Sequence, residues 1–210
     1  ISDGNNVEYS YDAITVTVNA PLDEETGGTI SSPSGFNFDV GGLGSQTITG
    51  QSSFPFSTIA VLGNTIDAYT LRVVDSNADG QQYFARFYLL NDYGDTSAKT
   101  ITPYLIDIDD GVLVNLTVVD IPSNLTVPNV RVSLYSGEGG TLYEEGLTDS
   151  LGIMQLVMLT QKLYFLNVEN ITQDTNYFSG NLFPSSTGLT VYINKTSSSS
   201  IFNPNNIFYS

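Results

Sequence analysis

The sequence predicts an all-β protein, on three observations. β-branched and aromatic residues alternate with polar residues along most of the 210-residue chain, and helical periodicity is almost absent. Turn-forming Gly, Asn, Asp, Ser and Pro recur about every 8 to 12 residues, the spacing typical of β-sandwiches. The length suits one large domain or two ordinary ones. We therefore expect two immunoglobulin-like antiparallel β-sandwich domains in tandem.

The N-terminal domain is expected to cover residues 1–108. Alternation predicts its strands at 7–19, 29–31, 36–40, 46–49, 57–62, 68–75, 82–90 and 99–106. The Gly-rich stretch 41–53 is the least strand-like part, and we expect it to be a long mobile connection.

The second domain is expected to cover residues 109–195. Its strands are predicted at 112–120, 130–135, 141–144, 153–158, 163–169 and 189–194. The segment 106–111 between the domains is short and partly apolar, so the domains should abut rather than swing freely. A Ser-rich tail, 196–210, follows and is expected to be loosely held, although its apolar pairs at 201–202 and 207–209 are unusual for a solvated tail.

Three features of the second half carry a family resemblance. The first strand ends in Asp120, Val127-Pro-Asn-Val130 opens the next strand, and Thr148-Asp-Ser-Leu-Gly152 precedes a third. In this pattern residues 110–194 resemble the small sandwich of Cna B-type repeats, the transthyretin-like group and carboxypeptidase regulatory-like domains. The resemblance implies a fold and no particular activity.

Two details of this resemblance can be weighed physically. A tight turn before a strand needs an acceptor side chain and a residue that tolerates a positive φ, which Asp149 and Gly152 supply. Many Cna B-type domains carry a Lys–Asn isopeptide bond whose lysine lies on the first strand. Strand 112–120 has no lysine, so we expect that cross-link to be absent here.

The composition excludes several classes of function. The net charge of −16 reflects 22 acidic but only 6 basic residues, so nucleic acid is a poor partner and an anionic membrane surface is disfavoured. No apolar run is long enough to insert in a membrane as a helix. The chain has no His and no Cys, which removes the common catalytic triads, thiolate metal sites and disulfides. No other spacing singles out a catalytic pair or a cofactor site, and we expect no enzyme activity and no cofactor.

One segment has the start of a calcium loop. Asp75, Asn77 and Asp79 precede Gly80 in the spacing of a D-x-[DN]-x-D-G motif, whose oxygens would point at the ion. The twelfth position holds Arg86 instead of the usual glutamate, and the flanks are strand-like. A hairpin turn is the alternative. A second acidic group, made by Asp107, Asp109 and Asp110, could contribute to a structural calcium site at the domain junction.

Four N-x-[ST] sequons are candidate N-glycosylation sites. Their number is what chance predicts, but all four lie in the second domain. Alternation along 112–120 leaves Asn115 and Thr117 on the face opposite the apolar one, where a sugar could be carried. The four acceptors are Asn115, Asn124, Asn170 and Asn194.

The first strand, 7–19, is unusually long and changes phase. A bulge near Ala13 would explain the change within one sheet, and so would a strand that leaves one packing surface and enters another. The second arrangement describes a donor strand, which completes the sheet of a neighbouring subunit. An ordinary first strand within its own chain is the alternative. The apolar positions are Val7, Tyr9 and Tyr11 in one phase and Ile14, Val16 and Val18 in the other.

These features together favour a secreted structural subunit of a cell-surface filament, a pilus or thread, that polymerises with copies of itself by donor-strand complementation. The chain looks like the donor-strand-linked pili and threads of archaea and bacteria, although no motif specific to one family is present. It begins at Ile1, which indicates a cleaved signal peptide and an extracellular location. The alternative is an extracellular or virion-surface adhesin or carbohydrate-binding module, with Tyr-rich loops at 83–93 and 177–183 stacking on glycans.

Overall fold

The computed structural model describes residues 11–30, 36–40, 44–48, 53–62, 70–75, 82–90, 99–170, 175–184, 188–195 and 207–209. For residues 11–16, 39–40, 44–48, 53–62 and 207–209 it describes the backbone alone. Every regular element within these ranges is a β-strand, which confirms the predicted all-β class. The described part contains no helix with the length and hydropathy to cross a membrane.

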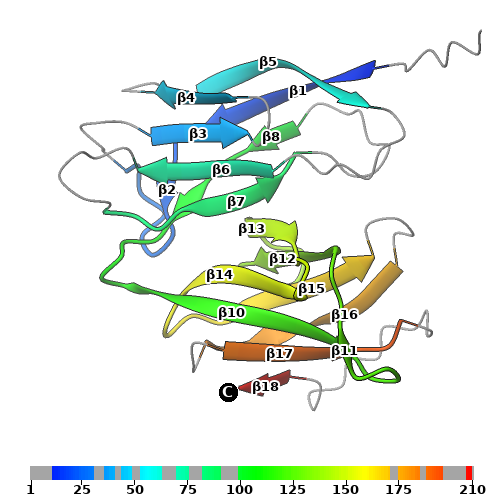
Figure 1. Ribbon diagram of the computed structural model, residues 1–210. Coiled ribbons are helices and arrows are strands. Elements are labelled where there is room, and N and C mark those ends of the chain that lie inside the picture. The colour runs from blue at the N-terminus through cyan, green and yellow to red at the C-terminus, as the bar shows by residue number, and fades with distance from the viewer. Residues whose placement is uncertain are drawn as a thin grey trace, which may run out of the picture.

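The N-terminal strands form two main sheets that lie above the rest of the chain in Figure 1. A three-stranded sheet has the order β5-β1-β8, from β5 (Ser53–Leu62), β1 (Tyr11–Asn19) and β8 (Lys99–Ile101). A four-stranded sheet has the order β4-β3-β6-β7, from β4 (Gly44–Ile48), β3 (Phe36–Val40), β6 (Thr70–Asp75) and β7 (Arg86–Leu89). A short parallel pair, β2 (Leu22–Asp23) and β9 (Tyr104–Leu105), closes one side.

The C-terminal strands form a second pair of sheets. One has the order β11-β10-β17-β18, with β14 also paired to β10, and comprises β10 (Gly111–Asp120), β11 (Leu125–Thr126), β14 (Ile153–Leu159), β17 (Gly188–Ile193) and β18 (Ile207–Tyr209). The other has the order β13-β12-β15-β16, from β12 (Val130–Tyr135), β13 (Leu142–Leu147), β15 (Tyr164–Asn170) and β16 (Thr175–Leu182).

Each pair of sheets encloses its own apolar core, as a β-sandwich requires. In β10, Val114, Leu116 and Val118 are buried against the facing sheet, whereas Leu113 and Asn115 point outward. Each of these fully buried aliphatic side chains contributes about 1.5–3 kcal/mol through removal from water. A separate core lies in the N-terminal part and is drawn from both of its sheets: Val18, Ile30, Phe36, Phe38, Leu71, Val73, Tyr88, Leu90 and Leu105.

The turn before β14 forms as its sequence predicts. The carboxylate oxygen Oδ1 of Asp149 accepts the N–H groups of Leu151 at 2.8 Å and Ile153 at 2.9 Å. Gly152 has φ +74°, a conformation that side chains rarely adopt. A Cβ at this position would lie 2.7 Å from the Cβ of Thr126, so both the turn and the close packing require glycine.

The structure corrects three expectations about single elements. Within the stretch 41–53, β4 pairs with β3 as a hairpin, which confirms the strand predicted at 46–49 with its start two residues earlier and its end one residue earlier, and corrects the expectation of a long connection there. The segment 177–183, expected to be a loop, lies mostly in β16, which pairs with β15. Part of the tail forms β18, which pairs with β17. β16 and β18 were hard to predict because β16 alternates poorly and gains its strand conformation by pairing with β15, and β18 is only three residues long.

The pairing is mostly antiparallel but includes parallel contacts. β1 runs parallel to β8, and β10 runs parallel to β17. Parallel neighbours need long crossover connections, and the chain segments between these strands supply them.

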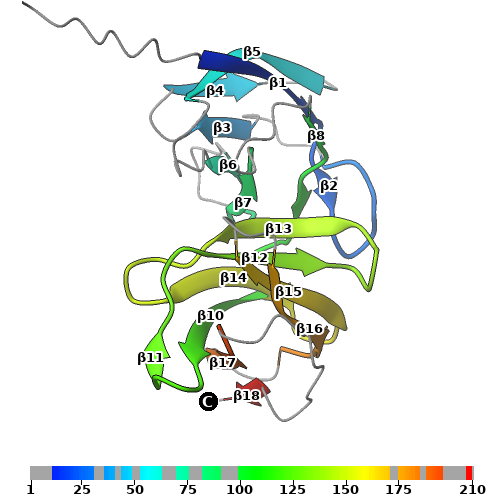
Figure 2. The ribbon, with the colours of Figure 1, turned by 90° about the vertical axis from the view of Figure 1, so that its right-hand side faces the viewer.

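The two parts meet where β13 of the C-terminal part lies under β7 of the N-terminal part (Figure 2). The chain crosses between them through the turn at 107–110, and a small apolar cluster packs beside it. That cluster joins Phe84 and Ile106 to Val157 and Leu159. The two parts therefore share buried contacts, in keeping with the short connection. The expected domain boundary at 108/109 stays a prediction.

Candidate functional site

The structure brings together only part of the predicted calcium loop. Asp75 ends β6, is buried, and accepts the N–H of Gln82 at 3.3 Å. Asn77 and Asp79 lie outside the described residues. Asp107 accepts the N–H of Asp109 at 3.0 Å within its own turn. No group of three acidic, His or Cys side chains in the described part of the chain has the arrangement to hold a metal ion. Calcium binding stays a prediction.

Acidic side chains nevertheless surround Tyr83. Burial raises the pKa of the Tyr83 hydroxyl, and the carboxylates of Asp107, Asp23 and Asp75 raise it further. Tyr83 also forms an isolated β-bridge with Asp107. The two acidic segments that the sequence singled out are therefore brought to the same side of the junction.

The four predicted sequon acceptors lie in different surroundings. Asn115 is exposed on β10, where its Oδ1 accepts the Nε2–H of Gln155 at 3.4 Å. Asn124 is exposed in a turn with φ 55°. Asn170 ends β15 and donates its amide to the hydroxyl of Tyr177 at 2.8 Å. Asn194 is partly exposed just after β17. Glycosylation of all four stays a prediction.

The candidate donor strand pairs within its own chain in this structure. Val7 and Tyr9 lie outside the described residues. Tyr11, Ile14 and Val16 lie in β1, which pairs antiparallel with β5, and Val18 is 1% exposed in the N-terminal core.

The pairing of this strand with β5 contains a bulge, but the bulge is not in β1 itself. The β1–β5 register shifts between Ile14 and Val16, because Ile14 faces Ile59 whereas Val16 faces Phe56. Two steps along β1 thus span three along β5. The extra residue of the bulge therefore lies in β5, opposite Thr15, and not near Ala13 in the first strand as expected. A bulge in the partner strand leaves the alternation of β1 unchanged, so this pairing does not account for the predicted change of phase.

A buried ionic cluster, which we call the junction cluster, lies where the two parts meet. It consists of Glu24, Arg86, Glu144, Lys162 and Tyr164. Arg86 is 0% exposed, and its guanidinium donates through Nη1 to Glu144 at 2.9 Å and through Nη2 to Glu24. Glu24 also accepts the hydroxyl of Tyr164 at 2.5 Å and lies 3.3 Å from Nζ of Lys162.

The cluster connects the two parts through charge. Glu24 and Arg86 come from the N-terminal part, and Glu144, Lys162 and Tyr164 come from the C-terminal part. Two carboxylates face two cations, so the formal charges balance. Buried ion pairs add little net stability but penalise other arrangements strongly, because a separated partner would be left charged and unsolvated. The cluster is therefore suited to fixing how one part sits on the other.

Burial shapes the titration of the cluster. Burial raises the pKa of Glu144 to about 7, although Arg86 and the N–H of Val157 oppose this shift. The Val157 N–H donates to Oε2 of Glu144 at 3.0 Å. Burial by itself lowers the pKa of Arg86, but the carboxylates of Glu144 and Glu24 outweigh it and raise the pKa overall. Burial and Glu24 raise the pKa of the Tyr164 hydroxyl, which stays protonated and donates.

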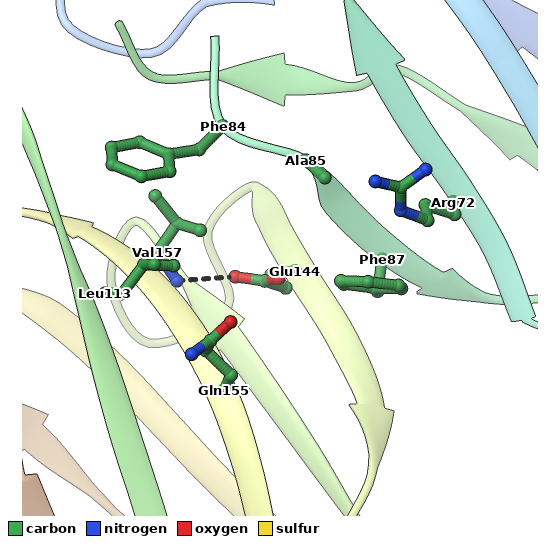
Figure 3. Close-up of a pocket in the computed structure, with 8 residues that line it drawn as sticks. All are labelled: Arg72, Phe84, Ala85, Phe87, Leu113, Glu144, Gln155 and Val157. Carbon is green, nitrogen blue, oxygen red and sulfur yellow. Dashed lines mark hydrogen bonds between the residues drawn. The ribbon is translucent and has the colours of Figure 1, made fainter. Parts of the chain in front are cut away.

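A cavity of about 220 Å³ lies beside the junction cluster (Figure 3). Its lining comes from both parts and combines two phenyl rings with polar side chains. Oε1 of Glu144, a lining residue, is buried and has no hydrogen-bond partner among the described residues, since Oε2 takes both N–H donors. The lining residues are Arg72, Phe84, Ala85, Phe87, Leu113, Glu144, Gln155 and Val157.

Sequence reasoning missed both the junction cluster and the cavity. One signal was present: Arg86 shares the alternation phase of Tyr88 and Leu90, which are both buried, so a charge stands where an apolar residue is expected. A charge on a buried face needs a partner. Nothing in the sequence indicates which partner, because Glu144 lies 58 residues away.

No protein-family model matches this sequence, and no curated protein matches it. Among solved structures, the TIE protein of Bacillus anthracis is similar over 88% of this chain and 34% of that chain, with 13% identity and a TM-score of 0.30. This chain thus spans about a third of its length. The shaft pilin SpaA of Lactobacillus rhamnosus GG is similar over 92% of this chain and 100% of that chain, with 9% identity and a TM-score of 0.34. BcpA, the major pilin subunit of Bacillus cereus, is similar over 89% of this chain and 56% of that chain, with 10% identity and a TM-score of 0.32. Identities and TM-scores this low do not show a shared function.

Proposed function

We propose that this protein is a secreted structural subunit of a cell-surface filament, in which copies of the chain are joined by donor-strand complementation through residues 7–19. The observation that carries the proposal is the placement and pairing of the first strand. β1 lies at one end of the two-part molecule, away from the junction (Figures 1 and 2), and pairs along its length with β5. A strand at that end can enter the sheet of a neighbouring copy and leave the rest of the molecule undisturbed.

The pairing of β1 supports exchange between molecules. β1 contributes main-chain pairs to β5 along its length, from Tyr11 opposite Leu62 to Asn19 opposite Ser53. The same pairs form equally well when the strand comes from a neighbouring copy, because a swapped element makes identical contacts. A chain whose first strand enters its neighbour would therefore lose no pairing and would gain a partner.

Open sheet edges also support assembly into a filament. β5 is a ten-residue strand, and among the described strands it pairs only with β1. Of the strands that the structure describes, β18 pairs only with β17 and is the outermost in its sheet. Long unpaired edges invite further strand pairing, and only covering or pairing them removes that tendency. In a filament these edges are available for contacts between subunits.

The junction cluster supports a structural role as well. A filament with a regular repeat needs each subunit to keep one internal geometry. The ion pair of Arg86 with Glu144 and the hydrogen bond from Tyr164 to Glu24 tie the N-terminal part to the C-terminal part, and all four side chains are buried. The two parts would then act as one rigid unit along the filament.

Electron microscopy tests whether the protein forms filaments. The secreted protein is imaged without exposure to denaturing conditions. We expect thin filaments with a regular axial repeat. Deleting residues 1–19 should abolish them, whereas deleting residues 196–210 should leave them intact if the N-terminal strand is the donor. Compact single particles from the full chain would contradict the proposal and favour the adhesin or carbohydrate-binding alternative.

A cysteine pair tests the donor strand itself. The chain has no Cys, so any added pair is unique. Ala13 faces Ala60 across β1 and β5, a spacing that a disulfide can span. Oxidised Ala13→Cys/Ala60→Cys protein should migrate as a covalent ladder on a denaturing gel, because each disulfide would join two molecules.

A second cysteine pair, placed between two strands of the same chain, is the matched control for that result. Asn115 faces Gln155 on β10 and β14, which belong to the same chain in either arrangement. Asn115→Cys/Gln155→Cys protein should therefore stay monomeric on the gel. A monomeric product from both pairs would show that β1 pairs within its own chain and would overturn the donor-strand mechanism.

A further inference from the structure

The cavity beside the junction cluster lies against a candidate glycosylation site. Leu113 and Gln155, which line the cavity, are outward-facing neighbours of Asn115. Leu113 lies two residues earlier on β10, so its side chain is on the same face, and Gln155 faces Asn115 directly across β14. The acceptor amide therefore lies at the rim of the cavity.

The sequon is presented correctly for modification. Asn115 is exposed, and Thr117 shares its outward face. The hydrogen bond from Gln155 uses Oδ1 of Asn115 and leaves Nδ2, the atom that carries an N-linked sugar, without a described partner. Attachment of a sugar at Nδ2 is compatible with that hydrogen bond.

We propose that the cavity seats the first sugar of a glycan attached to Asn115, so that the glycan bridges the two parts of the molecule. The size fits: about 220 Å³ is below the range of cavities that hold drug-sized ligands and suits a single sugar ring. The lining fits as well, because Phe84 and Phe87 offer apolar ring surfaces to the C–H groups of a sugar.

Polar groups in the lining would meet the sugar hydroxyls. The side chains of Arg72 and Gln155 carry hydrogen-bond donors at the cavity (Figure 3). Oε1 of Glu144 has no hydrogen-bond partner in the described part of the chain. A sugar hydroxyl that reaches it would satisfy a buried oxygen whose burial is otherwise costly.

Covalent attachment makes weak contacts sufficient. A sugar tethered at the rim has an effective concentration in the millimolar range at the cavity, so a few contacts keep it seated. Arg72, Phe84 and Phe87 come from the N-terminal part, whereas Asn115 and Gln155 come from the C-terminal part. A seated sugar would therefore reinforce the contact that the junction cluster makes. This inference does not depend on whether the protein polymerises.

The test uses the full chain secreted from a host whose N-glycans begin with N-acetylglucosamine. Glycopeptide mass spectrometry would follow release of the glycan from Asn115 by an amidase, in folded and in denatured protein. We expect Asn115 to be occupied and its glycan to be released about tenfold more slowly from the folded protein, because a seated sugar must first leave the cavity. The glycan on Asn124, in an exposed turn, is the internal control and should show no such protection.

Two variants distinguish protection of the glycan by the cavity from an effect of general stability. Phe87→Ala removes one wall of the cavity, and Leu113→Ser alters a side chain that is 39% exposed and therefore tolerant. Both should raise release from folded Asn115 to the rate in denatured protein, whereas Phe183→Ala, at an exposed aromatic residue outside the cavity, should not. An unoccupied Asn115, or equal release from folded and denatured wild-type protein, would overturn the proposal.

Discussion

Replacing Arg86 with methionine tests the role of the junction cluster most directly. Methionine keeps much of the volume of the side chain but removes its charge and its donors. In the wild-type protein Arg86 is the only described residue that holds both carboxylates, Glu24 and Glu144, at the same time. The variant would leave these two carboxylates to their remaining partners.

The structure gives the size of the effect. Glu24 would keep the Tyr164 hydroxyl at 2.5 Å and Lys162 at 3.3 Å, so it stays compensated. Among the described residues, Glu144 would keep only one hydrogen-bond partner, the N–H of Val157 at 3.0 Å. Removing one partner of a buried pair typically costs about 3–5 kcal/mol of the free energy of unfolding. We expect a loss in this range at pH 8, and a smaller loss at pH 5, where Glu144 is neutral.

Urea unfolding is the suitable measurement, because urea does not screen charges. The chain has no Trp, so its 13 Tyr provide the fluorescence signal, with circular dichroism as a second probe. Arg131→Met is the matched control: Arg131 pairs with Glu169 at 2.5 Å but is 11% exposed, and its loss should cost about 1 kcal/mol. Adding Glu144→Met to Arg86→Met should restore most of the lost stability, because no unpaired charge then remains at that position.

Two results would refute this reasoning. A loss below about 1 kcal/mol for Arg86→Met at pH 8 would mean that the cluster is hydrated and not truly desolvated. Equal losses for Arg86→Met and Arg131→Met would mean that burial does not distinguish the two ion pairs.

Three further predictions concern other described residues. Because burial raises the pKa of Glu144 from 4.5 to about 7, the folded protein binds this proton more tightly than the unfolded chain does. Stability should therefore fall by at most about 3 kcal/mol as the pH rises from 4.5 to 7, and Glu144→Gln should flatten that slope in urea midpoints measured across the range. Gly152→Ala should lower the melting temperature sharply, because its Cβ would lie 2.7 Å from Thr126, whereas Gly139→Ala, also at positive φ but with open space around it, should cost only about 1 kcal/mol. Thr148→Val should cost about 1–3 kcal/mol in the same urea assay, because the buried Thr148 hydroxyl donates at 2.8 Å to one backbone carbonyl and accepts at 3.1 Å from one backbone N–H.

The strands that sequence alone located best are those with strict alternation. Strands 36–40 and 130–135 were predicted with the bounds that the structure has, and 112–120 differs by one residue. Alternation locates these strands because one face of each strand packs against a core, so every second residue is apolar and buried. β16 and β18 were missed because their sequences alternate poorly, and β16 gains its conformation by pairing with β15.

The candidate sites divide in the same way. Motifs that act locally, such as the Asp149–Gly152 turn, were predictable because every group that they need lies within a few residues. The calcium motif has the local pattern, but a metal site also depends on ligands from elsewhere in the fold. Sequons mark an acceptor such as Asn115 but say nothing of the surface around it.

The sequence by itself determined that this protein is all-β, that it has no His and no Cys, and that its 22 acidic residues far outnumber its 6 basic ones. These properties depend on composition and on neighbours along the chain. Only the tertiary structure decided that Glu24, Arg86 and Glu144 meet in a buried junction, and that Phe84 and Phe87 line a cavity together with Leu113 and Gln155, two neighbours of Asn115. Such contacts join residues far apart in sequence. The residues next to a charged or aromatic side chain along the chain do not indicate which partner it will contact in the folded protein.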